Sequence, residues 1–259
     1  NGIVISGRDA NSYGDVGYNA LDLSYSTGNS TTHGATGDFS MSMGYNAKSS
    51  GDHSTAMGFA AKALDNFSTA IGLEAEASGM YSNALGGKTL ASGNYSNAMG
   101  YLTTAAGSYS TSMGNSTDAT GNYSTAMGYN TYAEADYSTA MGRYTDAQSF
   151  TETVIGQYNT SYTPNSNWNW NSSDRLFVIG NGTSSNAKSD AMVVLKNGNT
   201  GIGLSLPTEK LEVDGNIKAT AIFSDSLQIK GSSIMMANNQ VSPALSVMKA
   251  AGTSSGDVL

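Results

Sequence analysis

The feature that most constrains this 259-residue chain is a 14-residue repeat in its first half. One residue type returns at this step nine times, at Gly44, Gly58, Gly72, Gly86, Gly100, Gly114, Gly128, Gly142 and Gly156. A long apolar residue stands directly before each glycine: Met43, Met57, Ile71, Leu85, Met99, Met113, Met127, Met141 and Ile155. Serine precedes the glycine by four residues, except where Glu152 takes its place, and a ring directly precedes each of these serines. One repeat is therefore one structural unit that stacks on its neighbours.

The repeat favours strands over a helix. Fourteen residues also make two heptads, but a coiled coil would place glycine on one stripe at about 1 kcal/mol per residue relative to alanine. The run Ser-Thr-Ala-Met alternates between two faces, and glycine suits a tight corner. The sequence thus predicts an all-β parallel solenoid in which two short strands form a coil and each coil rises by about 4.8 Å.

The columns of the repeat predict which side chains face inward. Ala56, Ala61 and Ala63 are small enough for the inside of a narrow roll. The Met/Ile/Leu column would then form an apolar stripe on the outside, which we expect other copies of the chain to cover. The opposite register would turn every side chain to the other face, and this alternative stays open.

The motif S-T-A-M-G-x-x-(T/A)-x-A-x-G, repeated over about residues 11–156, resembles the head repeats of YadA-like trimeric autotransporter adhesins. The resemblance implies a left-handed parallel β-roll, a homotrimer around one axis, and attachment as the function. Thr55, Asn83 and Thr125 stand where the family often has Val, so one face is more polar. Residues 1–156 are assigned to this head.

Residues 157–175 interrupt the repeat with a segment rich in Asn and Ser that holds both tryptophans. This composition predicts a connecting loop. Its aromatic side chains, Tyr158, Tyr162, Trp168 and Trp170, are candidate saccharide-binding residues. The alternative is that the tryptophans plug the open end of the roll.

Residues 176–259 carry a different pattern. Two strand-like runs, 176–180 and 191–195, precede a G-I-G…P-x-x-K-L-x-V-x-G-x-I-x-A stretch at 201–219. This stretch resembles a linker of phage tail fibres and bacterial surface fibres that often precedes an endosialidase-type intramolecular chaperone. It implies a β-prism-like shaft interleaved between three chains. We expect Leu259 to be the scar left when such a chaperone is cleaved off, with a boundary unrelated to processing as the alternative.

Charge and composition exclude several classes of function. With 12 Lys+Arg against 20 Asp+Glu, the net charge of −8 argues against nucleic-acid binding. No apolar run approaches 18 residues, so we expect no membrane insertion by this chain. His53 occupies the ring column, and no constellation of catalytic or metal-ligating residues stands out. We predict no enzymatic activity, no cofactor and no metal.

These observations lead to one main hypothesis and two alternatives. The main hypothesis is an extracellular trimeric attachment fibre, on a bacterial surface or in a virion tail fibre, that recognises a cell-surface receptor or glycan. A purely structural fibre spacer is one alternative. An ice-binding solenoid is the other, suggested by a threonine column at Thr55, Thr69, Thr111, Thr125, Thr139 and Thr153. The receptor, and the choice between bacterial adhesin and viral fibre, stay open.

Overall fold

A computed structural model describes residues 2–4, 10–27 and 32–219 of the chain. Residues 1–217 form one compact unit and residues 218–259 a second. Almost all of the second unit lies outside the described residues. So do the C-terminal part of the predicted 176–259 shaft and the proposed scar at Leu259.

Each coil of the roll consists of a long strand, a bend, a short strand and a turn. In one coil these are β6 (Thr55–Phe59), a bend at Ala60, β7 (Lys62–Ala63) and a turn that ends at Phe67. Ala60 has a φ of 52°, which places it in the left-handed region. The predicted coil of two short strands is confirmed.

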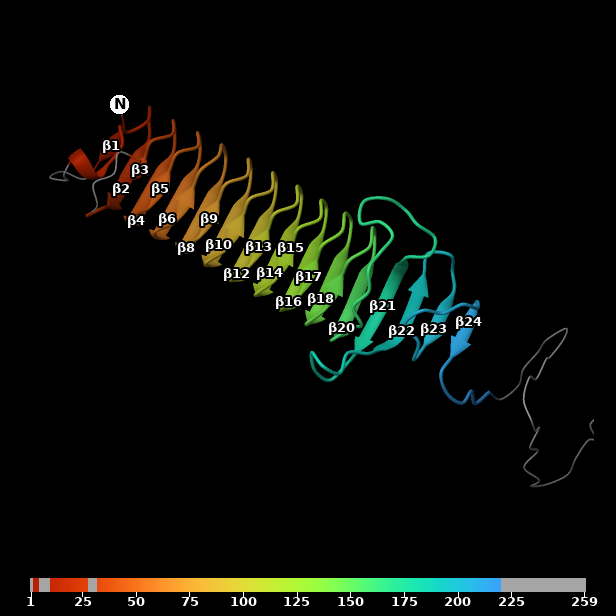
Figure 1. Ribbon diagram of the computed structural model, residues 1–259. Helices are drawn as coiled ribbons and strands as arrows, with labels where there is room; N and C mark the ends of the chain where they lie inside the picture. Colours follow the sequence, from red (N-terminus) through yellow and green to blue (C-terminus); the bar gives the residue numbers. More distant parts are fainter. Residues whose placement is uncertain (1, 5–9, 28–31, 220–259) are drawn as a thin grey trace, which may run out of the picture. The chain divides into compact units, whose positions relative to one another are not determined.

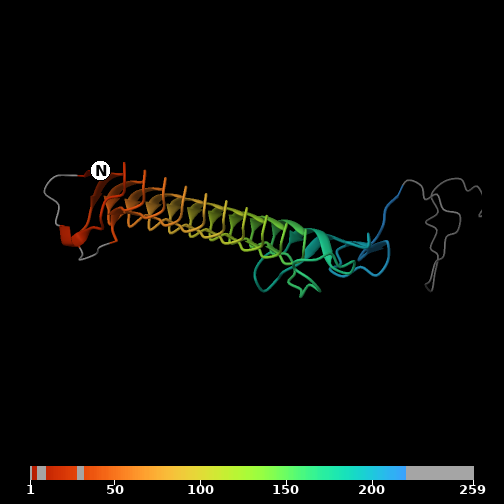
Figure 2. The ribbon, with the colours of Figure 1, turned by 90° about the horizontal axis from the view of Figure 1, so that it is seen from above.

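The coils stack in parallel register to give two sheets (Figures 1 and 2). Pairs such as Ala56 with Ala70 and Met57 with Ile71 show that the register step is the 14-residue repeat. The further long strands are β4 (Met41–Tyr45), β8 (Thr69–Leu73), β10 (Asn83–Gly87), β12 (Asn97–Tyr101), β14 (Thr111–Asn115), β16 (Thr125–Tyr129), β18 (Thr139–Arg143) and β20 (Thr153–Gln157). The further short strands are β3 (Gly34–Ala35), β5 (Lys48–Ser49), β9 (Glu76–Ala77), β11 (Leu90–Ala91), β13 (Thr104–Ala105), β15 (Asp118–Ala119), β17 (Tyr132–Ala133) and β19 (Asp146–Ala147).

Less regular elements extend the roll before the repeat. β2 (Leu21–Tyr25) pairs in parallel with β4, and β1 (Ile3–Val4) pairs with β2. A short 3-10 helix, η1 (Ala10–Ser12), lies between them in the chain. The architecture of the described residues is thus an all-β roll, as predicted.

Small side chains fill the interior. Ala56, Ala61 and Ala63 are fully buried, and the same three columns are buried in the neighbouring coils. The predicted inward register is therefore correct. The buried serine column closes the turn: in six coils its hydroxyl donates to the carbonyl three residues earlier, at 2.5 to 2.7 Å. These residues are Ser40, Ser54, Ser68, Ser82, Ser124 and Ser138.

The repeated glycine is needed for a reason other than the predicted corner. Gly100 lies inside β12, one residue before its end, with a φ of +126°. A Cβ atom there would lie 2.0 Å from the carbonyl oxygen of Gly114 in the next coil. The column is glycine because stacked backbones approach closely at this point, while the chain itself bends two residues later.

The sheet continues past residue 156. β21 (Arg175–Asn181) pairs in parallel with β20, so that Gly180 lies beside Gly156 and Val178 beside Val154. β21 is therefore one more rung, displaced in the sequence by an inserted loop. β22 (Asp190–Leu195) and β23 (Thr200–Ile202) follow as antiparallel strands, and β24 (Leu211–Val213) pairs in parallel with β23. The boundaries predicted at 156 and 176 do not divide this sheet.

Candidate functional site

The first candidate surface is the apolar stripe on the long strands. Its residues lie on the outer face, and five of them, Ile71, Met99, Met113, Met127 and Met141, are 36 to 40% exposed. In-register pairing places each beside the next, as with Met113 and Met127. The stripe thus lies where the sequence predicted it, and its role as a seam between chains stays a prediction.

A second surface is a ladder of stacked rings along the turns of the roll. Neighbouring ring centroids lie 4.6 to 5.0 Å apart and the ring planes are within 9° of parallel. The ladder consists of Phe39, His53, Phe67, Tyr81, Tyr95, Tyr109, Tyr123 and Tyr137. Each of these residues has a φ of 55 to 60°, a left-handed conformation that the sequence pattern did not reveal.

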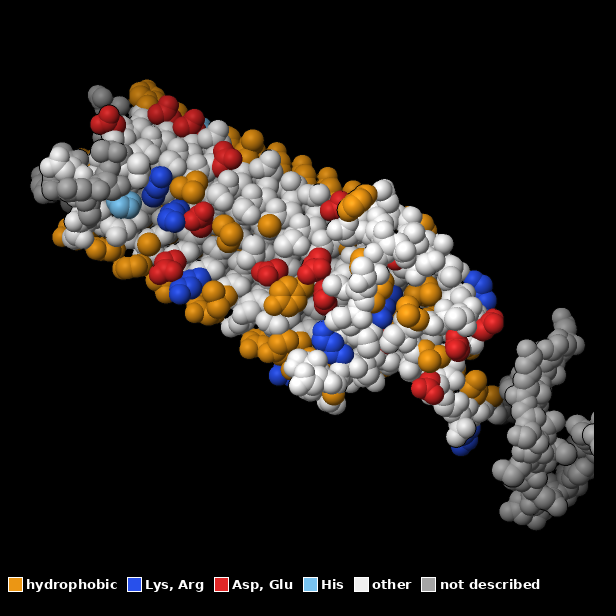
Figure 3. Space-filling view, in the orientation of Figure 1, with side chains coloured by type: hydrophobic (Ala, Val, Ile, Leu, Met, Phe, Trp, Pro, Cys, Tyr) orange, Lys and Arg blue, Asp and Glu red, His pale blue; other side chains and the backbone are white. Residues whose placement is uncertain are grey.

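The stacking decides what the ladder can bind. Because each ring covers the face of its neighbour, mainly ring edges point to solvent. A sugar packs against a ring face, so the ladder is poorly suited to bind one. Figure 3 shows one side of the molecule, where charged groups are scattered and hydrophobic side chains gather along both long edges.

The third surface is the loop between β20 and β21. It separates the four aromatic residues that the sequence proposed as one binding patch. Tyr158 is buried and stacks on Tyr144 at 4.7 Å, whereas the Tyr162 ring lies under the Arg175 guanidinium, 4.2 Å from ring centroid to Cζ. Trp168 and Trp170 are 65% and 56% exposed.

These positions correct both expectations for the loop. The four residues do not make a single patch, because Tyr158 and Tyr162 are used in packing. The tryptophans do not plug the roll either, since β21 continues the sheet and Val178 covers the position that follows Val154.

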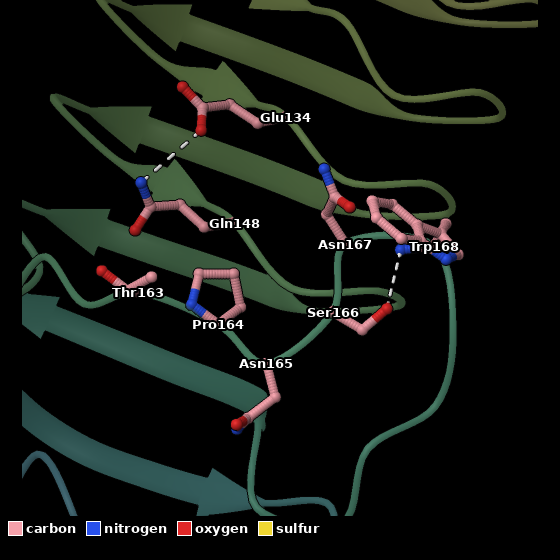
Figure 4. A pocket seen from close by; sticks show the side chains of 8 residues that line it. All are labelled: Glu134, Gln148, Thr163, Pro164, Asn165, Ser166, Asn167 and Trp168. Carbon is pink, nitrogen blue, oxygen red and sulfur yellow. Dashed lines mark hydrogen bonds between the residues drawn. The ribbon is translucent and has the colours of Figure 1, made fainter.

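Beside Trp168 the loop and the roll line an open cavity of about 330 Å³ (Figure 4). Its lining consists of Glu134, Gln148, Thr163, Pro164, Asn165, Ser166, Asn167 and Trp168. Glu134 and Gln148 come from successive coils, each directly after a short strand, and the other six come from the loop. Gln148 Nε2 donates to Glu134 Oε2 at 3.5 Å. Sequence reasoning found Trp168 but missed the two roll residues, which only the stacking of coils brings next to the loop.

The loop is fastened to the roll at several points. The backbone N–H of Asp136 donates to the Asn167 carbonyl at 2.9 Å, and that of Phe150 donates to the Ser166 carbonyl at 3.2 Å. Buried Asp174 accepts hydrogen bonds from the backbone N–H groups of Asn165 and Ser166, at 2.7 and 3.1 Å. These bonds fix the loop as one wall of the cavity.

A buried polar cluster lies at the base of the loop. Arg175 forms an ion pair with Asp190 at 3.5 Å, and both side chains are almost fully buried. Glu152 Oε2 accepts hydrogen bonds from the backbone N–H groups of Gln148 and Ser149, each at 2.9 Å. In the sequence, Glu152 stands out because it replaces the serine that every other repeat has four residues before its glycine.

Burial sets the electrostatics of this cluster. It raises the pKa of Glu152 to about 7, against the opposing effect of the two backbone donors. Burial together with the nearby Glu134 carboxylate also raises the pKa of Asp146 to about 7. Burial raises the pKa of the Tyr162 hydroxyl as well. These groups are held in the fold rather than presented to a ligand.

The described residues contain neither a metal-binding cluster nor a membrane-spanning helix. Within residues 2–4, 10–27 and 32–219, no three His, Cys, Asp or Glu side chains gather into a group that could hold a metal ion. In the same part of the chain, no helix has the length and apolar character needed to cross a membrane.

Comparison with known families bears on the roll. Residues 35–61, 49–75, 66–89, 91–117 and 119–145 match the YadA head domain repeat. Over these ranges the roll is similar to YadA head repeats. The match supports the head part of the resemblance and leaves residues 11–34 and 146–156, the loop and β21–β24 outside it. A comparison with curated proteins gives no match. The resemblance of residues 201–219 to a fibre linker, and the chaperone it implies, stay predictions.

Proposed function

We propose that this chain is the head of a homotrimeric attachment fibre, exposed outside the cell or virion, that binds a cell-surface receptor or glycan. The observation that carries the proposal is the apolar stripe, which runs outward-facing along successive coils of an adhesin-type repeat. The function is binding rather than catalysis.

The interior of the roll explains why the stripe needs a partner. The buried columns are Ala, Ser and Thr, so each coil buries little apolar surface inside itself. The Met/Ile/Leu column is the one outward column of the long strands that is large and aliphatic in every repeat, since the strand ends vary from Phe59 and Leu73 to Asn115 and Arg143. Each of its side chains is a substantial hydrophobic group. Packing three stripes together would supply the core that a single narrow roll lacks. Met side chains suit such a seam because they adapt to neighbouring surfaces.

A trimer also fits an attachment function. Three copies of the loop on one fibre multiply a modest affinity, provided that all three can reach the target together. The resemblance of residues 201–219 to a fibre linker supports a shaft behind the head and leaves both a bacterial surface fibre and a phage tail fibre as its setting.

Attachment is tested with the labelled protein on a panel of bacterial and animal cells. We expect the wild type to attach to at least one cell type, and a Trp168→Ala/Trp170→Ala variant to lose this attachment while its mass by light scattering is unchanged. A wild type that attaches to none of the cells contradicts the proposal and favours a structural spacer. Unchanged attachment of the double variant moves the binding site to the flank of the roll.

A further inference from the structure

We infer that the cavity beside Trp168 is a binding site for a neutral saccharide. The inference rests on the proposed attachment function and narrows it to one ligand class and one set of residues. It replaces the four-residue aromatic patch with a pocket built jointly by the loop and the roll.

The lining has the chemistry that a sugar requires. A pyranose presents apolar C–H faces and a rim of hydroxyl groups. Trp168 supplies an exposed indole that no other ring covers among the described stacked pairs, in contrast to the rings of the ladder. Glu134, Gln148 and Asn167 supply carboxylate and amide groups, and Pro164 adds an apolar surface. Six of the eight lining residues are polar, which suits a ligand rich in hydroxyl groups, and a volume of about 330 Å³ lies in the range of small-molecule sites.

Charge decides between neutral and acidic sugars. Glu134 is the only charged residue of the lining, and neither Lys nor Arg is among the eight residues. The negative charge of Glu134 also contributes to the raised pKa of Asp146, which lies in the same short-strand sheet. A carboxylated or sulfated saccharide would meet this negative charge without a cation to balance it. A neutral saccharide can instead donate hydroxyl hydrogens to the Glu134 carboxylate.

The pocket is formed before a ligand arrives. Gln148 links loop and roll through two long hydrogen bonds: its Oε1 accepts from the Tyr162 backbone N–H at 3.4 Å, and its Nε2 donates to Glu134 at 3.5 Å. Asn165 Nδ2 donates to Asp174 at 2.8 Å, so Asn165 holds the loop rather than the ligand. A wall that is already ordered loses little conformational entropy on binding.

The proposed trimer leaves this pocket accessible. Glu134 and Gln148 directly follow β17 and β19, which belong to the short-strand sheet. The apolar stripe belongs to the long-strand sheet. Packing along the stripe would therefore leave one open pocket in each chain, three in a trimer.

Tryptophan fluorescence and calorimetric titration test the inference with lactose, N-acetyllactosamine, cellotriose, maltotriose and chitotriose, and with 3′-sialyllactose as the acidic partner of lactose. We expect the wild type to bind at least one neutral sugar and to bind lactose better than 3′-sialyllactose. Trp168→Ala should weaken binding of the neutral sugar by at least about tenfold. Trp170→Ala is the matched control, since Trp170 is similarly exposed in the same loop but does not line the cavity; we expect a change below about twofold.

Glu134→Gln tests the charge argument. We expect this variant to narrow the difference between lactose and 3′-sialyllactose. Binding of none of the neutral sugars, equal losses in Trp168→Ala and Trp170→Ala, or better binding of 3′-sialyllactose by the wild type would overturn the inference.

The outcomes separate the pocket from the proposed function. If the wild type binds no sugar and Trp168→Ala still attaches to cells, the pocket is refuted and the attachment function remains. Sugar binding that depends on Trp168 in a protein that attaches to no cell refutes attachment and leaves the pocket.

Discussion

The Tyr95 and Tyr109 rings stack with centroids 4.8 Å apart and planes 2° from parallel. This distance is also the strand spacing of a β-sheet, because each coil rises by one strand. Any side chain that recurs once per coil is therefore carried to the contact distance of its neighbour. The same step from coil to coil produces the ladder of rings in the turns, the stripe of methionines on the long strands and the glycine column beside that stripe.

The ring ladder should stabilise the roll. Replacing Tyr109 by Ala removes two stacking contacts of about 0.5–1.5 kcal/mol each and lowers the free energy of unfolding by about 1–3 kcal/mol. Tyr109→Phe keeps both contacts and should stay near the wild type, since Phe already occupies this column at Phe39 and Phe67. The denaturation midpoint at fixed protein concentration gives the comparison, and equal midpoints for Tyr109→Ala and Tyr109→Phe would show that the stack is not stabilising.

The close approach of stacked backbones should make the glycine column intolerant of any side chain. Gly100→Ala would place a Cβ atom 2.0 Å from the Gly114 carbonyl oxygen at a φ of +126°, so we expect loss of the folded roll. Gly87 is the control in the preceding coil, because a Cβ atom there meets only the movable Tyr101 ring at 3.0 Å. Circular dichroism should show folded protein for Gly87→Ala and not for Gly100→Ala; a folded Gly100→Ala would contradict the packing described.

Several buried hydroxyl groups of the described residues have no hydrogen-bond partner. Thr103 is one of them: it is fully buried, and its Oγ1 is unpaired. Thr103→Val keeps the shape and removes the unpaired group, so we expect a gain of about 1 kcal/mol in the free energy of unfolding.

Thr117 provides the matched comparison in the next coil. Its Oγ1 lies 2.7 Å from Ser112 Oγ, so Thr117→Val should give no gain. Unfolding curves measured side by side test the pair. A gain in Thr117→Val as large as that in Thr103→Val would remove the hydrogen-bond explanation.

Glu152 should make stability depend on pH. Because its folded-state pKa of about 7 lies above the ordinary value of 4.5, the folded state binds more protons than the unfolded state between these two pH values. The contribution of Glu152 to the free energy of unfolding is thus present below about pH 4.5, falls as pH rises towards 7 and is flat above it. Glu152→Gln should remove this part of the slope in unfolding curves recorded from pH 5 to 8. If the pH dependence of the free energy of unfolding is the same in Glu152→Gln as in the wild type, it comes from other groups, and Asp146 is the first of these to test.

The regular part of the fold could be predicted from the sequence because the same type of side chain recurs at each position of the repeat, and its size favours either the inside or the outside of the roll. The sequence favoured an inward Ala56 and an outward Met57 because a narrow roll suits small side chains, and the buried Ala56 decides against the opposite register that the pattern left open. The left-handed conformation of Tyr109 could not be predicted, because an aromatic residue in a turn does not indicate a positive φ. The rung formed by β21 was missed because the 14-residue step fails there, although Gly180 continues the glycine column in space.

The loop between β20 and β21 does not have the arrangement that its composition suggested. Four aromatic residues close in sequence suggested one patch, yet Tyr158 stacks on Tyr144 and Tyr162 lies under Arg175. Gln148 lines the cavity only because the loop bends back over an earlier coil. Residues that only the stacking of coils brings together cannot be recognised in a local sequence motif.

If the apolar stripe is the seam of a trimer, sedimentation equilibrium should detect that trimer in solution. The chain of 26.7 kDa should give a species of about 80 kDa. Met99→Asp/Met113→Asp places two charges on the stripe and should leave unfolded or aggregated chains. Leu90→Asp/Thr104→Asp, on the short-strand sheet of neighbouring coils, is the control and should remain a trimer. A well-folded monomer, either of the wild type or of Met99→Asp/Met113→Asp, would show that the stripe is not a trimer seam.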